Sequence, residues 1–292
     1  MDNTRRQYKS LAACACLIGA LSGQSVAAPQ RVVSTFLCTD EYVYRLVPRE
    51  HIAALSYEAT DRRPVVSTIA DAARGIRTIR PSTETVMSLK PDLVVMYAGT
   101  NTRLHLNLSR LHVPILDVPW ADSIADVRSV TRMLGSKLGD PARAQALLDE
   151  MDRKIAQARA EAPRPPVKAI LYEPQGYASM QGLTGEVMQI AGIANAAPPG
   201  EMTRTGQLPV EAVIARAPEL LILGGEERQG SARAYTILHH PAFKALEGRT
   251  HMEFATLTPL LCPGPWSLDS AQTLGNLARR AHALAHRKGR TY

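Results

Sequence analysis

The chain has 292 residues, of which 45% are hydrophobic and 21% are charged, as is ordinary for a globular protein. This length suits one large domain or two domains of about 100 to 150 residues. The net charge is +7, but the basic residues are scattered and do not cluster with aromatic residues. This pattern favours a solvated basic surface over nucleic-acid binding, and attraction of an anionic ligand is a weaker alternative.

The first 27 residues have the features of a signal peptide. Basic residues precede an apolar run, 11–21, which is shorter than the roughly 20 residues that a membrane-spanning helix needs. Small residues then form a cleavage signal, so we expect the mature chain to begin near Ala28 and to be exported to the periplasm. A partial twin-arginine pattern and an early lipoprotein-like box are weaker alternatives.

Apolar runs alternate with helical segments through the first half of the mature chain. The run 93–97 is almost entirely apolar, as a parallel strand covered on both faces should be. This alternation predicts βαβ units and a parallel sheet. We predict strands at 31–36, 52–57, 93–97 and 113–118.

A long helix interrupts the alternation. Asp140 and Pro141 are favourable residues for a helix start, and apolar residues then recur on one helical face. The prolines at 163–166 end the segment. We therefore predict a linking helix over 140–163, a rigid connection roughly 30 Å long.

Strands and helices then alternate again. We predict strands at 168–172 and 220–223, and helices at 184–193, at 235–246 with an interruption at Pro241, and at 267–286 with Ser267 as its cap. The expected fold class is α/β, with two Rossmann-like lobes that contain parallel sheets and are joined by a single long helix. The expected boundaries are a signal peptide at 1–27, an N-terminal lobe at 28–139, the linking helix at 140–163 and a C-terminal lobe at 164–292.

One phrase occurs in both halves of the chain. It begins at Glu84 and again at Glu211, and in each copy a proline follows seven positions later, then an acidic residue and an apolar strand. The two copies indicate two similar lobes, each with an acidic residue at a comparable position.

This organisation resembles the periplasmic substrate-binding proteins of ABC importers for cobalamin and iron chelates, the class with a helical backbone. The phrases that carry the resemblance span the mature chain: 84–95, 111–118 with 123–127, 185–195 and 211–218. The resemblance implies that ligand lies in a cleft between lobes that move little. It also implies that an exposed glutamate on each lobe docks onto arginines of the permease, and the matching positions are Glu84 and Glu211. Alternatively, each glutamate stabilises only the first turn of its own helix.

Ligands of doubly wound sheets bind at the loops that follow the carboxyl ends of the strands. The aromatic residues there would stack on a flat ligand, although each of the two tryptophans would equally cover the rim of its own lobe. Arg62 and Arg63 would hold carboxylates or phosphate, but a solvated role is favoured. The candidate ligand-binding residues are Cys38, Thr39, Asp40, Tyr57, Tyr97, Trp120, Tyr177, Cys262 and Trp266.

Cys38 and Cys262 occupy similar positions in the two lobes. Free thiols are the favoured state, and a disulfide or ligation of a soft metal are the alternatives.

No catalytic motif is present, so we expect no enzyme, no catalytic residues and no resident metal or cofactor. The adjacent pair His239 and His240 is more consistent with a structural turn than with a metal site. The expected function is capture of a metal chelate or corrinoid-like ligand (cobalamin, ferric siderophore or haem, with its own cobalt or iron) for a permease dimer. The expected protein is a monomer that binds no nucleic acid. The alternatives are a secreted metal-dependent hydrolase and a binding protein for a zinc or manganese importer.

Overall fold

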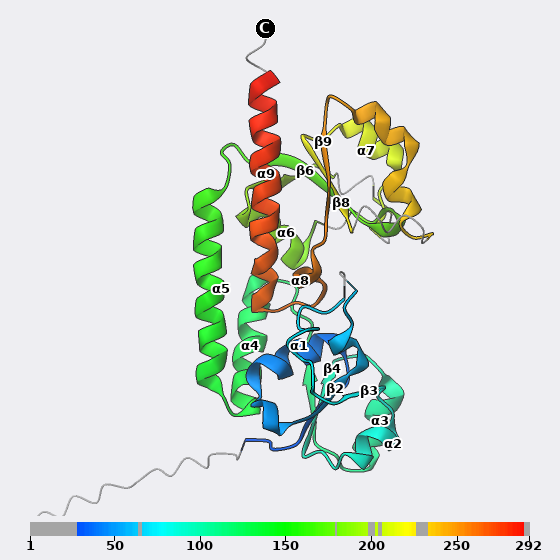
Figure 1. Ribbon diagram of the computed structural model, residues 1–292, viewed down its shortest axis with the longest axis vertical. Helices are drawn as coiled ribbons and strands as arrows, with labels where there is room; N and C mark the ends of the chain where they lie inside the picture. Colours follow the sequence, from blue (N-terminus) through cyan, green and yellow to red (C-terminus); the bar gives the residue numbers. More distant parts are fainter. Residues whose placement is uncertain are drawn as a thin grey trace, which may run out of the picture.

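Two α/β lobes lie one above the other and are joined along one side by long helices (Figure 1). The structure is a computed structural model, and it describes residues 28–63, 66–178, 180–197, 202–203, 206–225 and 233–288. Each lobe contains a parallel sheet, and a long helix connects the lobes, so the predicted fold class is confirmed. The segment expected to be a signal peptide lies outside the described residues.

The N-terminal lobe is built on a parallel sheet with the strand order β3-β2-β1-β4-β5. Since every strand runs in the same direction, all carboxyl ends meet at one edge of the sheet. The predicted strand 93–97 is β4, and the side chains of Val94, Val95 and Met96 in it are fully buried. The strands are β1 (Val32–Ser34), β2 (Ile52–Ser56), β3 (Thr78–Ile79), β4 (Leu93–Tyr97) and β5 (Ile115–Val118).

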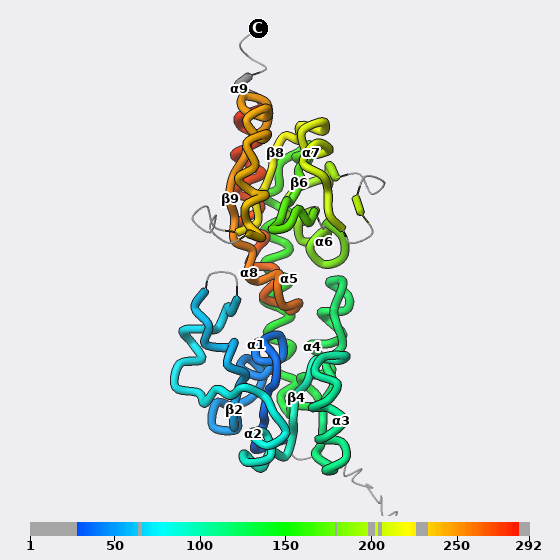
Figure 2. The backbone as a smooth tube through the Cα atoms, turned by 90° about the vertical axis from the view of Figure 1, so that its right-hand side faces the viewer, coloured from blue at the N-terminus to red at the C-terminus, as the bar shows by residue number. Residues whose placement is uncertain are grey.

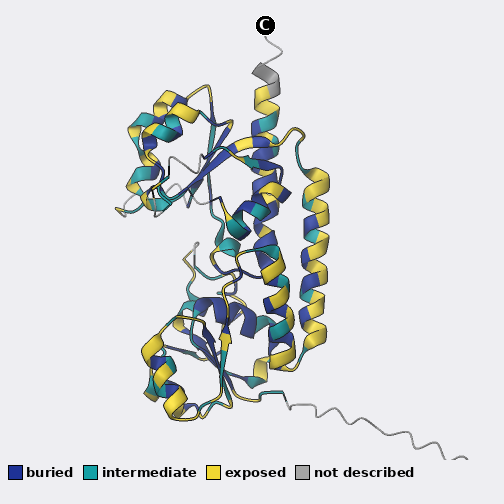
Figure 3. Ribbon diagram, turned by 180° about the vertical axis from the view of Figure 1, so that it is seen from behind, coloured by how far each residue is buried: buried dark blue, intermediate teal, exposed yellow. Residues whose placement is uncertain are grey.

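The helices of this lobe are α1 (Leu37–Leu46), α2 (Thr83–Ser88), α3 (Thr102–Arg110) and α4 (Ile124–Leu138). Helix α1 follows β1 at the carboxyl edge of the sheet. It lies at the side of the N-terminal lobe that faces the other lobe, yet it is almost entirely buried (Figure 3). Part of the C-terminal lobe therefore covers it.

The linking helix is α5 (Pro141–Glu161). The Asp140 side chain accepts a hydrogen bond from the backbone N–H of Arg143 at 2.8 Å, and Pro141 occupies the first turn, as the sequence predicts. One face of α5 is buried, and the opposite face is exposed along its length (Figure 3). This helix is the long connection between the lobes that was expected.

The C-terminal lobe has a second parallel sheet with the order β7-β6-β8-β9. Its strands are β6 (Val167–Tyr172), β7 (Ile193–Asn195), β8 (Leu220–Gly224) and β9 (His251–Ala255). Its helices are α6 (Gly182–Ile190), α7 (Val210–Arg216), α8 (Thr258–Leu261) and α9 (Asp269–Lys288). Helix α9 lies beside α5, so the two longest described helices run along one side of the molecule (Figure 1).

Two predicted helix boundaries in this lobe are wrong. Helix α6 ends at Ile190, because Gly192 adopts a positive φ of 80° and the chain enters β7 at Ile193. Ser267 does not cap α9. It lies in the 3-10 helix η8 (Pro265–Leu268), where its hydroxyl donates a hydrogen bond to the carbonyl of Pro259 at 3.0 Å.

The interruption predicted at Pro241 is present. The segment forms two 3-10 helices, η6 (Thr236–His239) and η7 (Pro241–Leu246), that meet at the proline. Proline has no N–H to donate, so a continuous helix through this position is disfavoured.

Candidate functional site

The lobes meet where the segment after β9 rests on α1 of the N-terminal lobe. Trp266 lies at the centre of this contact and is only 4% exposed. Its ring meets the Tyr42 ring edge-on, with 4.7 Å between centroids, and the Arg45 guanidinium lies 4.3 Å above it. The expectation that Trp266 lines the ligand cleft is therefore corrected: this ring holds the two lobes together.

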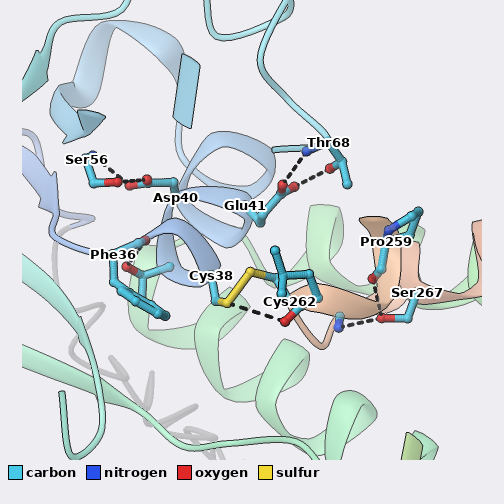
Figure 4. Close-up of a disulfide and its surroundings, with 12 residues drawn as sticks. Phe36, Cys38, Asp40, Glu41, Ser56, Thr68, Pro259, Cys262 and Ser267 are labelled. Atoms are coloured by element: carbon cyan, nitrogen blue, oxygen red, sulfur yellow. Dashed lines mark hydrogen bonds between the residues drawn. A yellow bond between two sulfur atoms is a disulfide. The ribbon is translucent and has the colours of Figure 1, made fainter. Parts of the chain in front are cut away.

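A disulfide crosses the same junction between Cys38 in α1 and Cys262 after α8 (Figure 4). The two Cα atoms are 4.9 Å apart, within the range that a disulfide requires, although the residues are 224 positions apart in the sequence. Both cysteines are buried. The favoured prediction of free thiols is wrong, and both sulfur atoms are occupied, so neither cysteine is a metal ligand.

A buried polar cluster lies beside the disulfide in the N-terminal lobe. The Asp40 carboxylate accepts hydrogen bonds from both the backbone N–H and the hydroxyl of Ser56, at the end of β2 (Figure 4). The Thr39 hydroxyl lies 2.7 Å from that of Ser34. Burial raises the pKa of Asp40 to about 7, although hydrogen bonds from Ser34 and Ser56 lower it in part. Thr39 and Asp40 are fully buried, so their expected role as ligand contacts is corrected: Asp40 positions the end of β2, and Thr39 is bonded to Ser34 at the end of β1.

An aromatic group lies at the carboxyl edge of the sheet in the N-terminal lobe. Trp120, which follows β5, is 55% exposed. Tyr97, at the end of β4, is itself buried and supports Trp120 edge-on, with 5.4 Å between the ring centroids. Burial raises the pKa of Tyr97. The structure therefore presents Trp120 as the exposed ring of this pair.

A second aromatic group follows the neighbouring strands of the same sheet. Tyr57, directly after β2, is 42% exposed, and the Arg80 guanidinium lies 4.1 Å above its ring. Arg62 and Arg63 are ion-paired with Asp71 and Asp61 on their own exposed loop. Those pairs agree with the favoured solvated role for Arg62 and Arg63.

The C-terminal lobe contains a pocket of about 420 Å³. It opens where β6, β8 and β9 end, so it occupies the position where doubly wound sheets bind ligands. The described part of the lining is mostly apolar, with one acidic residue, Glu173. The lining residues are Leu171, Glu173, Pro174, Thr184, Gly224, Gly225, Tyr235, Ala255, Leu257, Thr258, Leu260 and Leu261.

Glu173 is half-buried in this pocket, and burial raises the pKa of its carboxyl group. Gly224 makes room for it, because a Cβ atom at that position would lie only 2.9 Å from the Glu173 Cγ. The sequence identified the loop 173–177 but selected Tyr177, which is half-buried and does not line the pocket. The signal that was missed is an acidic residue directly after a buried apolar strand.

The two glutamates expected to dock onto a permease are both exposed. Each is the second residue of a short helix: Glu84 in α2 and Glu211 in α7. Both helices lie on the side of the molecule opposite α5 (Figures 1 and 2). Ser82 caps α2, whereas no side chain caps the start of α7.

Both histidines of the adjacent pair have structural partners. His239 stacks on Phe254 at 5.2 Å, and the His240 Nδ1 atom accepts a hydrogen bond from the backbone N–H of Ala242. Among the described residues, no group of three or more histidine, cysteine or acidic side chains is placed to hold a metal ion. In the same residues, every helix is too short or too polar to cross a membrane.

Comparison with known proteins gives a consistent result. A protein-family model described as "Periplasmic binding protein" matches residues 32–252. No curated protein sequence gives a significant match.

Several solved structures have the same fold. The heme-binding protein RhuT from Roseiflexus sp. RS-1 is 22% identical, with a TM-score of 0.67, and the match covers 88% of this chain and 99% of that one. BhuT in complex with two hemes is 21% identical, with a TM-score of 0.66 and coverage of 87% and 99%. The vitamin B12-binding protein BtuF of Vibrio cholerae is 16% identical, with a TM-score of 0.63 and coverage of 87% and 98%.

Proposed function

Because the chain belongs to the periplasmic binding protein family, we propose that it captures a metal chelate or corrinoid-like ligand between its lobes and delivers it to an ABC-importer permease. Cobalamin, a ferric siderophore and haem are the candidate ligands. Each contains its own cobalt or iron, so the protein needs no resident metal. In this proposal the protein works as a monomer in the periplasm, exported by the signal peptide at 1–27.

The observation that carries the proposal is that each lobe places a surface suited to a ligand at the carboxyl ends of its strands. The N-terminal lobe offers the exposed rings of Trp120 and Tyr57, and the C-terminal lobe offers a largely apolar pocket. Aromatic faces stack on flat conjugated ligands, and a pocket with few polar groups fixes their orientation. Both features suit a large, flat chelate better than a bare metal ion.

Titration calorimetry, which detects metal ions and chelates alike, tests this proposal directly. Purified mature protein is titrated separately with cyanocobalamin, hemin and a ferric hydroxamate siderophore, and with zinc and manganese chloride as controls. We expect saturable binding of at least one chelate with a Kd on the order of 1 μM or lower. Binding of the bare metal ions and of none of the chelates would contradict the proposal.

We also propose that Glu84 and Glu211 are the contacts with the permease. Two exposed anionic groups, one on each lobe, fix the orientation of a binding protein on a cationic receptor. Stabilisation of the helix start is the competing explanation. It is weaker for Glu84, because Ser82 already caps α2.

The alternative of a metal-dependent hydrolase gains no support from the comparisons. The family and the structural relatives described above are binding proteins.

A further inference from the structure

Among the residues that the structure describes, Glu173 is the one acidic residue that lines the pocket of the C-terminal lobe. It follows β6 directly, and β6 lies between β7 and β8 in the sheet. The Glu173 side chain packs closely against Gly224, and a residue larger than glycine at position 224 would crowd it. The ends of β6 and β8 therefore hold Glu173 in the lining of the pocket.

In the part of the chain that the structure describes, no hydrogen bond or ion pair involves the Glu173 carboxyl group, although its backbone N–H donates to the carbonyl of Tyr177 at 2.7 Å. A half-buried carboxyl group without a partner costs free energy, because it has lost part of its hydration. The raised pKa of this group reflects the same loss of hydration. A ligand that supplies a hydrogen-bond donor at this point would recover that free energy.

We propose that Glu173 is a specificity residue that accepts hydrogen bonds from N–H groups at the edge of the ligand. This inference rests on the proposed function, and it names the ligand class. Glu173 favours a chelate with amide or amine groups at its periphery and disfavours one with a carboxylate at the same place.

The candidate ligands differ in this respect. A corrinoid carries primary amides around its ring, whereas haem carries carboxylates. An amide N–H pairs with the Glu173 carboxylate as it stands. A ligand carboxylate in the same place either faces a like charge, which is costly in a site partly shielded from water, or requires Glu173 to take up a proton, which costs free energy at neutral pH even though burial reduces that cost. At this position, a corrinoid is the better match.

A comparison of haem with cobalamin would not isolate the effect of Glu173. Arg80, beside Tyr57 in the N-terminal lobe, offers a different place for the carboxylates of haem. The ligands should therefore differ only in the group that Glu173 is proposed to contact. A suitable set of ligands is cyanocobalamin together with its derivatives in which one peripheral amide has been hydrolysed to a carboxylate.

The experiment measures the Kd of each ligand in this set for the wild-type protein and for the variant Glu173→Gln. The glutamine side chain has nearly the same shape as glutamate. Glu50→Gln is the matched control, because Glu50 is exposed and lies just before the amino end of β2, away from the pocket. We expect the wild type and Glu50→Gln to prefer the amide over at least one carboxylate derivative by about tenfold or more. In Glu173→Gln this preference should fall to about twofold or less.

An unchanged preference in folded Glu173→Gln overturns the inference. Binding of hemin by the wild type with no binding of either corrinoid also overturns it, while leaving the proposed function in place. Failure of the wild type to bind any chelate overturns the proposed function itself.

Discussion

The Asp92 carboxylate accepts a hydrogen bond from the backbone N–H of Arg31 at 2.9 Å, one residue before β1 begins. Glu219 has the same relationship to the backbone N–H of Lys168 in β6, at 2.8 Å. Each acid follows the proline of its repeated phrase and directly precedes a strand, β4 or β8. Its hydrogen bond holds the neighbouring strand of the same sheet, β1 or β6. The repeat therefore supplies each lobe with a leading glutamate that faces solvent and a second acid that supports the sheet.

Removing either of these second acids should weaken the corresponding lobe. Asp92→Ala and Glu219→Ala should each lower the free energy of unfolding by about 1 kcal/mol, because backbone N–H groups lose their acceptor. Urea denaturation followed by circular dichroism measures this loss, with Glu50→Ala as an exposed control. If both variants unfold at the control's urea concentration, the hydrogen bonds do not support the sheets.

Loss of the disulfide should have a larger effect. Cys38→Ser combined with Cys262→Ser should lower the free energy of unfolding by about 2 to 5 kcal/mol, because the crosslink closes a very long loop in the unfolded chain. Alkylation of denatured protein before and after reduction, read by mass spectrometry, establishes the bond itself. Labelling of both cysteines in the unreduced mature protein would contradict this assignment.

The raised pKa of Asp40 predicts a specific pH dependence of stability. Its pKa is about 7 in the folded protein, against an ordinary value of 3.8, so the folded state binds more protons between these values. Stability should therefore fall as the pH rises from about 4 to 7, by at most about 1.4 kcal/mol per pH unit from this group. Asp40→Asn keeps an acceptor for the Ser56 N–H and removes the titration, so its stability should change less over this range.

Urea denaturation of the wild type and Asp40→Asn at a series of pH values tests this prediction. Glu173→Gln serves as a comparison, because burial also raises the pKa of Glu173. Parallel curves for the wild type and Asp40→Asn would show that Asp40 does not titrate in this range.

Trp120 should contribute to affinity and little to stability. It is 55% exposed, so Trp120→Ala removes an aromatic face available to a ligand without leaving a cavity in the core. We expect the Kd for the bound chelate to rise by about tenfold, and Trp120→Phe to recover much of the loss because stacking needs only an aromatic face. Absorption titration gives the Kd values, and an unchanged Kd for Trp120→Ala would remove Trp120 from the ligand site.

Reversing the charge at both leading glutamates should uncouple delivery from binding. Glu84→Arg combined with Glu211→Arg should abolish ligand uptake by cells and leave the Kd for ligand unchanged, because neither residue lines the pocket. The matched control reverses one other exposed glutamate in each lobe, Glu50→Arg with Glu247→Arg. Normal uptake with the first pair of changes, in a folded protein, would refute the docking role.

Local signals predicted much of the fold. Asp140 and Pro141 fix the start of α5 through interactions within one turn, so the sequence alone locates it. The apolar run of β4 and the proline that separates η6 from η7 are also local signals, so the sequence alone locates these elements. Strand β9 was not predicted: His251 and Glu253 interrupt its apolar pattern, and it lies at the edge of the sheet, where polar side chains reach solvent.

The site was harder to predict because it depends on contacts between distant segments. The sequence identifies the loops that follow the carboxyl ends of the strands, but whether a side chain in these loops is exposed depends on the other lobe. Trp266 and Trp120 both follow strands, yet only Trp120 is exposed, because α1 covers Trp266. Pairing of Cys38 with Cys262 likewise depends on a Cα separation that no local pattern contains.

The disulfide also changes the connectivity of the molecule. Residues 38–262 form a closed covalent ring that includes α5, the C-terminal sheet and every strand of the N-terminal sheet except β1. A single proteolytic cut anywhere in that ring leaves the two fragments attached to one another. Only reduction together with a cut, or two cuts, separates the lobes, so a nicked protein should run as one species until it is reduced.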